Sequence, residues 1–117
     1  MVDVEREWGV NYTMDLKGCN PVTMRSKQSI QEYVIALCKE IDIERLGDCQ
    51  IVALEDGSLV LSQVLDGGFI SGRFLATQNY LHLNMFCDFA IDLITTANMS
   101  LEFFGATEIS THYSVKY

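Results

Sequence analysis

The histidines and cysteines have the widest chemical range of any residues in this 117-residue chain, because they can bind metals or carry protons. The two histidines, His82 and His112, have no second metal-ligand residue at suitable spacing on their own predicted strands. The four cysteines form no CxxC pair and no pattern typical of a secreted disulfide framework; they are Cys19, Cys38, Cys49 and Cys87. We therefore expect no metal site, and reduced cysteines whose ordinary role is packing.

Adjacent glycines at Gly67-Gly68 are a second feature that could do chemistry, because glycine-rich loops bind phosphate through their backbone N–H groups. Such a loop leads directly into a helix, whereas a strand-forming run follows Gly68. The triplet Asp66-Gly67-Gly68 therefore predicts a tight turn between two strands.

Charge and composition exclude several classes of protein. Lys plus Arg number 8 against 16 for Asp plus Glu, so the net charge of -8 opposes binding to nucleic acid or anionic lipid. The sequence contains no apolar run long enough to span a membrane, and its N-terminus is charged where a signal peptide would be apolar. We expect a cytoplasmic protein with one globular domain over residues 1–117, and neither nucleic acid nor membrane as a partner.

Hydrophobic periodicity predicts six strands and two helices. Period-two alternation between turn residues predicts strands at residues 10–16, 49–55, 59–65, 69–76, 80–87 and 109–116. Apolar residues three and four apart predict helices at residues 26–41 and 90–104. This order predicts an α+β fold, a two-layer sandwich of an antiparallel sheet with two helices on one face. The other face, with Ser62, His82 and Asn84 among its side chains, is expected to be a dimer interface or a ligand floor.

Four segments resemble one known family in order and spacing across nearly the whole chain. They are WGVNYTMDLKGC at residues 8–19, LDGGFISGRF at 65–74, LNMF at 83–86 and FFGA at 103–106. The resemblance is to S-adenosylmethionine decarboxylase of the short prokaryotic and phage type, and it implies that family's fold. In the family the chain cleaves itself before a serine, which becomes a pyruvoyl group. The ketone of that group forms a Schiff base with the substrate amine and is the electron sink for decarboxylation.

The positions that carry this chemistry in the family differ in this chain. The family's cleavage serine falls at Gly68, its processing histidine at Arg73, its catalytic cysteine at Asp88 and a first-strand histidine at Asn11. Gly68 has no hydroxyl to attack the preceding carbonyl, and the guanidinium of Arg73 stays protonated. A one-residue shift would bring Cys87 to the cysteine position but would point its thiol to the other sheet face. We expect a divergent member with no self-processing and no pyruvoyl cofactor.

The same resemblance implies a set of ligand-binding candidates, which are Ser71, Arg73, Asn84, Cys87 and Asp88. If the family's histidine and cysteine positions share a pocket, Arg73 and Asp88 would face one another there. A guanidinium matches a carboxylate with two parallel hydrogen bonds. Our hypothesis is that a salt bridge between these two residues occupies the former catalytic centre.

Three interpretations of the function follow from the resemblance. The first is a catalytically inactive protein that binds S-adenosylmethionine or a related nucleoside, as a homodimer or as a regulatory partner of an active paralogue. The second is an active lyase of polyamine biosynthesis, cleaved at another serine such as Ser71 or Ser62. The third is a structural dimer module. Phe69, Phe74 and Phe86 are candidates for an adenine slot, with ordinary core packing as the alternative.

Overall fold

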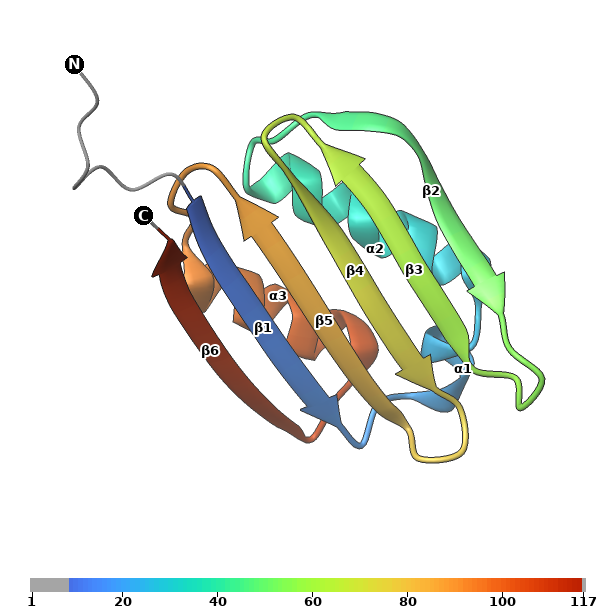
Figure 1. Cartoon of the computed structure of the whole chain (residues 1–117). Helices are drawn as coiled ribbons and strands as arrows, with labels where there is room; N and C mark the ends of the chain where they lie inside the picture. Colours follow the sequence, from blue (N-terminus) through green and yellow to red (C-terminus); the bar gives the residue numbers. More distant parts are fainter. Residues whose placement is uncertain (1–8, 117) are drawn as a thin grey trace, which may run out of the picture.

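The computed structural model describes residues 9–116 as an antiparallel sheet with helices against one of its faces (Figure 1). Trp8 and the charged segment before it, which entered the sequence analysis, lie outside the described residues. The predicted α+β two-layer architecture is confirmed. Within residues 9–116, no helix is long and apolar enough to cross a membrane.

Six strands form the sheet in the order β2-β3-β4-β5-β1-β6, and every neighbouring pair is antiparallel. Their bounds are β1 Gly9–Lys17, β2 Arg45–Ala53, β3 Leu59–Leu65, β4 Gly68–Leu75, β5 Tyr80–Cys87 and β6 Glu108–Lys116. Strand β1 therefore lies between β5 and β6, although β5 comes much later in the chain (Figure 1).

Strand β2 begins at Arg45, four residues before the predicted start at Cys49. The register of β2 against β3 shifts between Leu46 and Gln50, where a bulge or a similar irregularity interrupts the pairing of the two strands. A bulge breaks the period-two alternation of side chains, so the first part of this strand could not be recognised from its pattern.

Three helices cover one face of the sheet: α1 Pro21–Met24, α2 Lys27–Glu40 and α3 Leu93–Phe104. The sequence analysis does not predict the one-turn helix α1, because Asn20-Pro21 is also typical of a turn. Asn20 is instead an N-cap whose side chain accepts a hydrogen bond from the N–H of Val22 at 2.9 Å, and Pro21 occupies the first helical position, which it favours.

The two long helices begin at capping residues. Ser26 caps α2 by accepting a hydrogen bond from the N–H of Ser29 at 3.1 Å. Asp92 caps α3 through the N–H of Thr95 at 3.0 Å, and this cap places the start of the helix three residues after the predicted position. Helix α3 ends at Gly105, whose φ of 58° is the left-handed conformation predicted for it.

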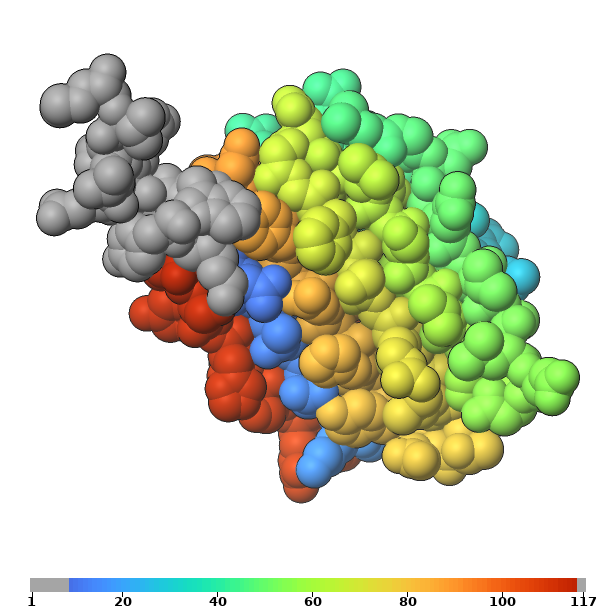
Figure 2. All heavy atoms as spheres, in the orientation of Figure 1, coloured from blue at the N-terminus to red at the C-terminus, as the bar shows by residue number. Residues whose placement is uncertain are grey.

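The core fills the space between the sheet and the long helices. Phe104 of α3 packs against Tyr33 of α2 and Phe74 of β4, with ring centroids 4.7 and 5.8 Å apart. The hydroxyl of the buried Tyr33 is hydrogen-bonded to Ser100 at 2.6 Å, which ties α2 to α3. The helices and their core thus occupy one face of the sheet, and the other face is free of helices (Figure 2).

Candidate functional site

Side chains on the open face of the sheet form three rows across the strands, because antiparallel pairing places residues directly opposite one another. From β3 through β4 and β5 to β1, the apolar row is Val64, Phe69, Phe86 and Asn11; the polar row is Ser62, Ser71, Asn84 and Thr13; the charged row is Val60, Arg73, His82 and Asp15. The apolar row lies near the start of β4 and the charged row near its end.

The apolar row contains a stacked pair of aromatic rings. Phe69 and Phe86 have ring centroids 5.9 Å apart and ring planes 19° apart. The ring of Phe86 lies across the backbone of Gly9, where any Cβ would overlap it. Phe69 is 42% exposed, whereas Phe74, the third aromatic candidate, is buried in the core on the helix side. Phe69 is therefore the exposed ring of this stacked pair, whereas Phe86 is half-buried.

The polar row centres on Asn84, which lies between Ser71 and Thr13 on the neighbouring strands. Its Oδ1 atom is buried and has no hydrogen-bond partner among the described residues. An unsatisfied buried acceptor is unfavourable. A donor group brought by a ligand or by a second chain would relieve it.

The charged row contains a hydrogen-bonded cluster formed by β1 and β5. Asp15 accepts hydrogen bonds from the hydroxyl of Tyr80 and from Nδ1 of His82, the latter at 2.7 Å. Burial alone would raise the pKa of Asp15, but these hydrogen bonds and the nearby charges of His82 and His112 lower it below its ordinary value. Donation to this carboxylate is also the first cause that raises the pKa of Tyr80, to about 12.

The hydrogen bond to Asp15 indicates which ring nitrogen of His82 carries a proton. An ionised carboxylate can accept hydrogen bonds but cannot donate them, so Nδ1 of His82 must carry the proton. In the neutral ring, Nε2 is then an acceptor. The side chain is 42% exposed, which leaves the ring accessible from the open face.

Arg73 extends the charged row onto β4, directly opposite His82, and its side chain is exposed. Its positive charge also reaches Asp56 in the turn before β3. Hydrogen bonds from Ser58 are the main cause that lowers the pKa of Asp56, and Arg73 adds a smaller electrostatic contribution.

The hypothesis of a salt bridge between Arg73 and Asp88 within the chain is wrong. Asp88 follows β5 and its N–H donates to the carbonyl of Gly67 at 2.8 Å, while Arg73 lies opposite His82. Along β5, His82 and Asp88 are about 20 Å apart, given the rise per residue of a β-strand, so Arg73 opposite His82 lies far from Asp88. Strands β4 and β5 are antiparallel. Arg73 near the end of β4 and Asp88 just after the end of β5 therefore lie at opposite ends of this strand pair.

The remaining candidates also separate. Ser71 and Asn84 lie opposite one another on the open face, but Cys87 is fully buried on the helix side. Burial raises the pKa of Cys87 to about 11, which keeps its thiol protonated near neutrality. Sequence analysis missed Asp15 and Tyr80, because each is an ordinary strand or turn residue until β1 is known to pair with β5.

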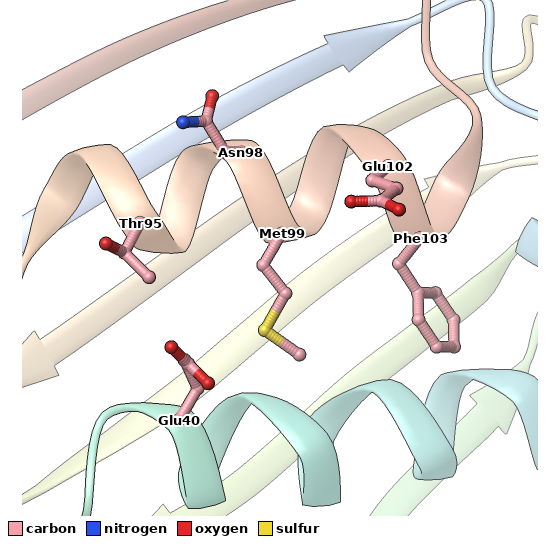
Figure 3. A pocket seen from close by; sticks show the side chains of 6 residues that line it. All are labelled: Glu40, Thr95, Asn98, Met99, Glu102 and Phe103. Atoms are coloured by element: carbon pink, nitrogen blue, oxygen red, sulfur yellow. The ribbon is translucent and has the colours of Figure 1, made fainter.

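A groove of about 580 Å³ lies on the opposite layer of the molecule, between α2 and α3 (Figure 3). Its lining residues are Glu40, Thr95, Asn98, Met99, Glu102 and Phe103. None of the candidate site residues from the sequence lines this groove. Among residues 9–116 there is no group of three or more His, Cys, Asp or Glu side chains placed to hold a metal ion.

Comparisons with known proteins agree with the fold. The sequence model of the S-adenosylmethionine decarboxylase family matches residues 10–116. The crystal structure of the adenosylmethionine decarboxylase from Aquifex aeolicus VF5 is similar with a TM-score of 0.79 and 11% sequence identity, over 93% of this chain and 90% of that one. A comparison with curated protein sequences finds no match. Because the family model covers almost all of the described residues, the chain belongs to the S-adenosylmethionine decarboxylase family.

Proposed function

We propose that this chain is a family member that does not cleave itself, carries no pyruvoyl group and has no decarboxylase activity. It keeps the open face of the sheet as a binding surface for S-adenosylmethionine or a related nucleoside. The observation that carries the proposal is the backbone around Gly68, and the rows on the open face support the choice of ligand.

Gly68 occupies a position that accepts no side chain. A Cβ built on it would overlap the carbonyl oxygen of Phe86 and lie 2.9 Å from the carbonyl carbon of that residue. It would also lie 3.1 Å from the Cα of Cys87. These are backbone atoms fixed by the pairing of β4 with β5, so they cannot turn aside as a flexible side chain would. A serine side chain therefore does not fit this backbone without a shift of the strands.

The neighbouring position is crowded in the same way. Gly67 has a φ of 91°, and a Cβ there would lie 2.7 Å from the carboxyl carbon of Asp88. The carboxylate thus packs against the turn that precedes β4, where the family has a thiol.

The order of the side-chain rows on the open face supports nucleoside binding. The exposed ring of Phe69 offers an aromatic face on which a base can stack. Ser71 and Asn84, one row away, provide the hydroxyl and amide groups that hydrogen-bond to a ribose.

Calorimetric titration with S-adenosylmethionine tests the binding, after the intact mass of the protein has been measured. We expect binding by the uncut chain. Loss of base stacking in Phe69→Ala should weaken it about fivefold or more. The control is Ile94→Ala, which truncates an exposed apolar residue of α3 on the other layer. Absence of binding at millimolar nucleoside, or equal affinity in the Phe69 variant, contradicts this part of the proposal.

A second chain is the partner that we propose for the open face, either another copy or an active paralogue. Two large apolar residues, Leu46 and Val64, are exposed at one end of this face, and association would remove them from water. We expect a dimer in sedimentation analysis of the protein alone, and a shift toward monomer in Val64→Glu. A monomer at high micromolar concentration would contradict self-association and leave the paralogue to be tested by mixing.

A further inference from the structure

We propose that strand β6 is a second interaction surface, which pairs antiparallel with β6 of another copy of this chain. The two six-stranded sheets would then join edge to edge, with the helices of both copies on the same side. This surface is separate from the open face of the sheet, and it requires no ligand. The position of β6, its regular pairing and the order of its side chains support the proposal.

The sheet has two edges, and β6 is the one suited to pairing. It spans Glu108–Lys116, and no strand lies beyond it in the part of the chain that the structure describes (Figure 1). Its nine residues pair with β1 without interruption, so a regular row of backbone N–H and C=O groups faces outward. Strand β2, at the other edge, has a shifted register between Leu46 and Gln50, and such an irregularity hinders pairing with another chain.

The composition of β6 lacks the usual protection of an exposed edge. Sheet edges are commonly protected by charged side chains or by proline. Between Glu108 and Lys116 the sequence contains no Asp, Glu, Lys, Arg or Pro. Tyr113, within this stretch, is 65% exposed. An uncharged edge of this length is a template for another strand, and the charges at its two ends indicate which strand fits.

The sequence of β6 is complementary to itself in the antiparallel direction. A two-fold axis at His112 would place each residue opposite one of matching character in the second copy. The pairs are Glu108 with Lys116, Ile109 with Val115, Ser110 with Ser114, Thr111 with Tyr113, and His112 with itself. Opposite charges, apolar side chains, two hydroxyls, and an aromatic ring beside a β-branched residue are favourable cross-strand pairs. No other centre pairs all nine residues, so a second copy is the partner that this strand fits.

This register also joins like faces of the two sheets. Ile109 and Val115 lie opposite Leu16 and Val10 of β1, whose buried side chains belong to the core on the helix side. Pairing would therefore continue the apolar layer from one copy into the other. A single strand edge buries less surface than a whole sheet face, so we expect this pairing at higher protein concentration than association through the open face.

Cysteine cross-linking tests the register. His112→Cys, in a Cys49→Ser background that removes the half-buried thiol, places the two new thiols opposite one another. Their Cα atoms would be about 5 Å apart, which allows a disulfide. In the control, Ser110→Cys, the two substituted positions would be about 13 Å apart, which does not allow one. We expect at least tenfold more disulfide-linked dimer under mild oxidation at residue 112. Equal yields, or no link at residue 112, overturn the proposal.

Charge reversal tests the partner by sedimentation in the high micromolar range. The background is Val64→Glu, which disrupts the association proposed for the open face, so that the two interfaces are measured separately. Glu108→Lys and Lys116→Glu should each weaken self-association about tenfold or more, because like charges then meet at both ends of the strand. The matched control is Glu55→Lys, which reverses an exposed charge just after β2 at the other edge.

Mixing the two charge-reversed variants completes the test. In a mixed pair every end contact again joins opposite charges, so association should return to the strength of the Val64→Glu parent. A variant that had lost its fold would not recover in this way. Single variants that associate as tightly as the parent, or a mixture that stays monomeric, would show that β6 does not pair with itself.

Discussion

Placing a side chain at Gly68 should destabilise the protein and should fail to restore cleavage. In Gly68→Ser the new Cβ overlaps the carbonyl oxygen of Phe86, so β4 and β5 must separate before the residue fits. Gly68→Ala introduces the same Cβ without a hydroxyl, so the pair of variants distinguishes the steric effect from the chemistry.

The size of the effect follows from the atoms that the Cβ would meet. Overpacking against groups that cannot move aside costs about 1–3 kcal/mol of unfolding free energy, which corresponds to about 4 °C in Tm for each kcal/mol. Gly72→Ala is the control on the same strand, because its Cβ meets the end of the Leu83 side chain at 3.0 Å. That side chain can shift, and replacement of a strand glycine gains about 0.5 kcal/mol, so we expect little net change.

Urea unfolding of the three variants and the wild type measures these differences, with an unchanged dependence on denaturant as the sign that the folded states are comparable. Intact-mass spectrometry of Gly68→Ser checks for cleavage. A Gly68→Ala variant as stable as the wild type would refute the steric argument. A Gly68→Ser variant that cleaves itself would show that the backbone still supports processing.

Three further predictions concern other groups of the fold. Replacing Asp15 with Asn should lower the unfolding free energy most near neutral pH. The pKa of Asp15 is lowered in the folded state, so its ionised form stabilises the fold at pH values above its ordinary pKa near 3.9. This contribution is lost as the pH falls through the folded pKa. Urea unfolding from pH 3 to pH 7 tests it, and a constant difference between the variant and the wild type contradicts it. A thiol reagent at pH 8 should label the half-buried Cys49 before Cys87, because Cys87 is buried and its pKa is about 11. Peptide mapping measures the order, and earlier labelling of Cys87 would contradict this prediction. Gly105→Ala should lower the unfolding free energy by about 1 kcal/mol, because its φ of 58° is unfavourable with a Cβ, and unchanged stability in urea would argue against the left-handed cap.

The sequence pattern predicted the element order and the sandwich well, because periodicity and turn residues are local signals. Its errors also have local causes. Asn20-Pro21 fits both a turn and a helix N-terminus, and only the structure distinguishes them. The irregular register after Leu46 hid the start of β2 from a search for alternation.

The candidate site was predicted less well, because it depends on which strands are neighbours. Strand parity placed His82 and Asn84 on the open face, and the structure confirms this. The partner of His82 is Asp15, 67 residues earlier in the chain, and no local pattern indicates that β1 lies beside β5. The hypothesis for Arg73 and Asp88 failed for a related reason, since it assumed proximity without a strand register.

Intact-mass spectrometry of the freshly purified protein tests the central claim most directly. A chain that does not process itself gives one species at 13.2 kDa that does not react with carbonyl reagents. Two fragments, the second beginning with a reactive pyruvoyl group in place of a serine, would contradict the account and identify the protein as a processed decarboxylase.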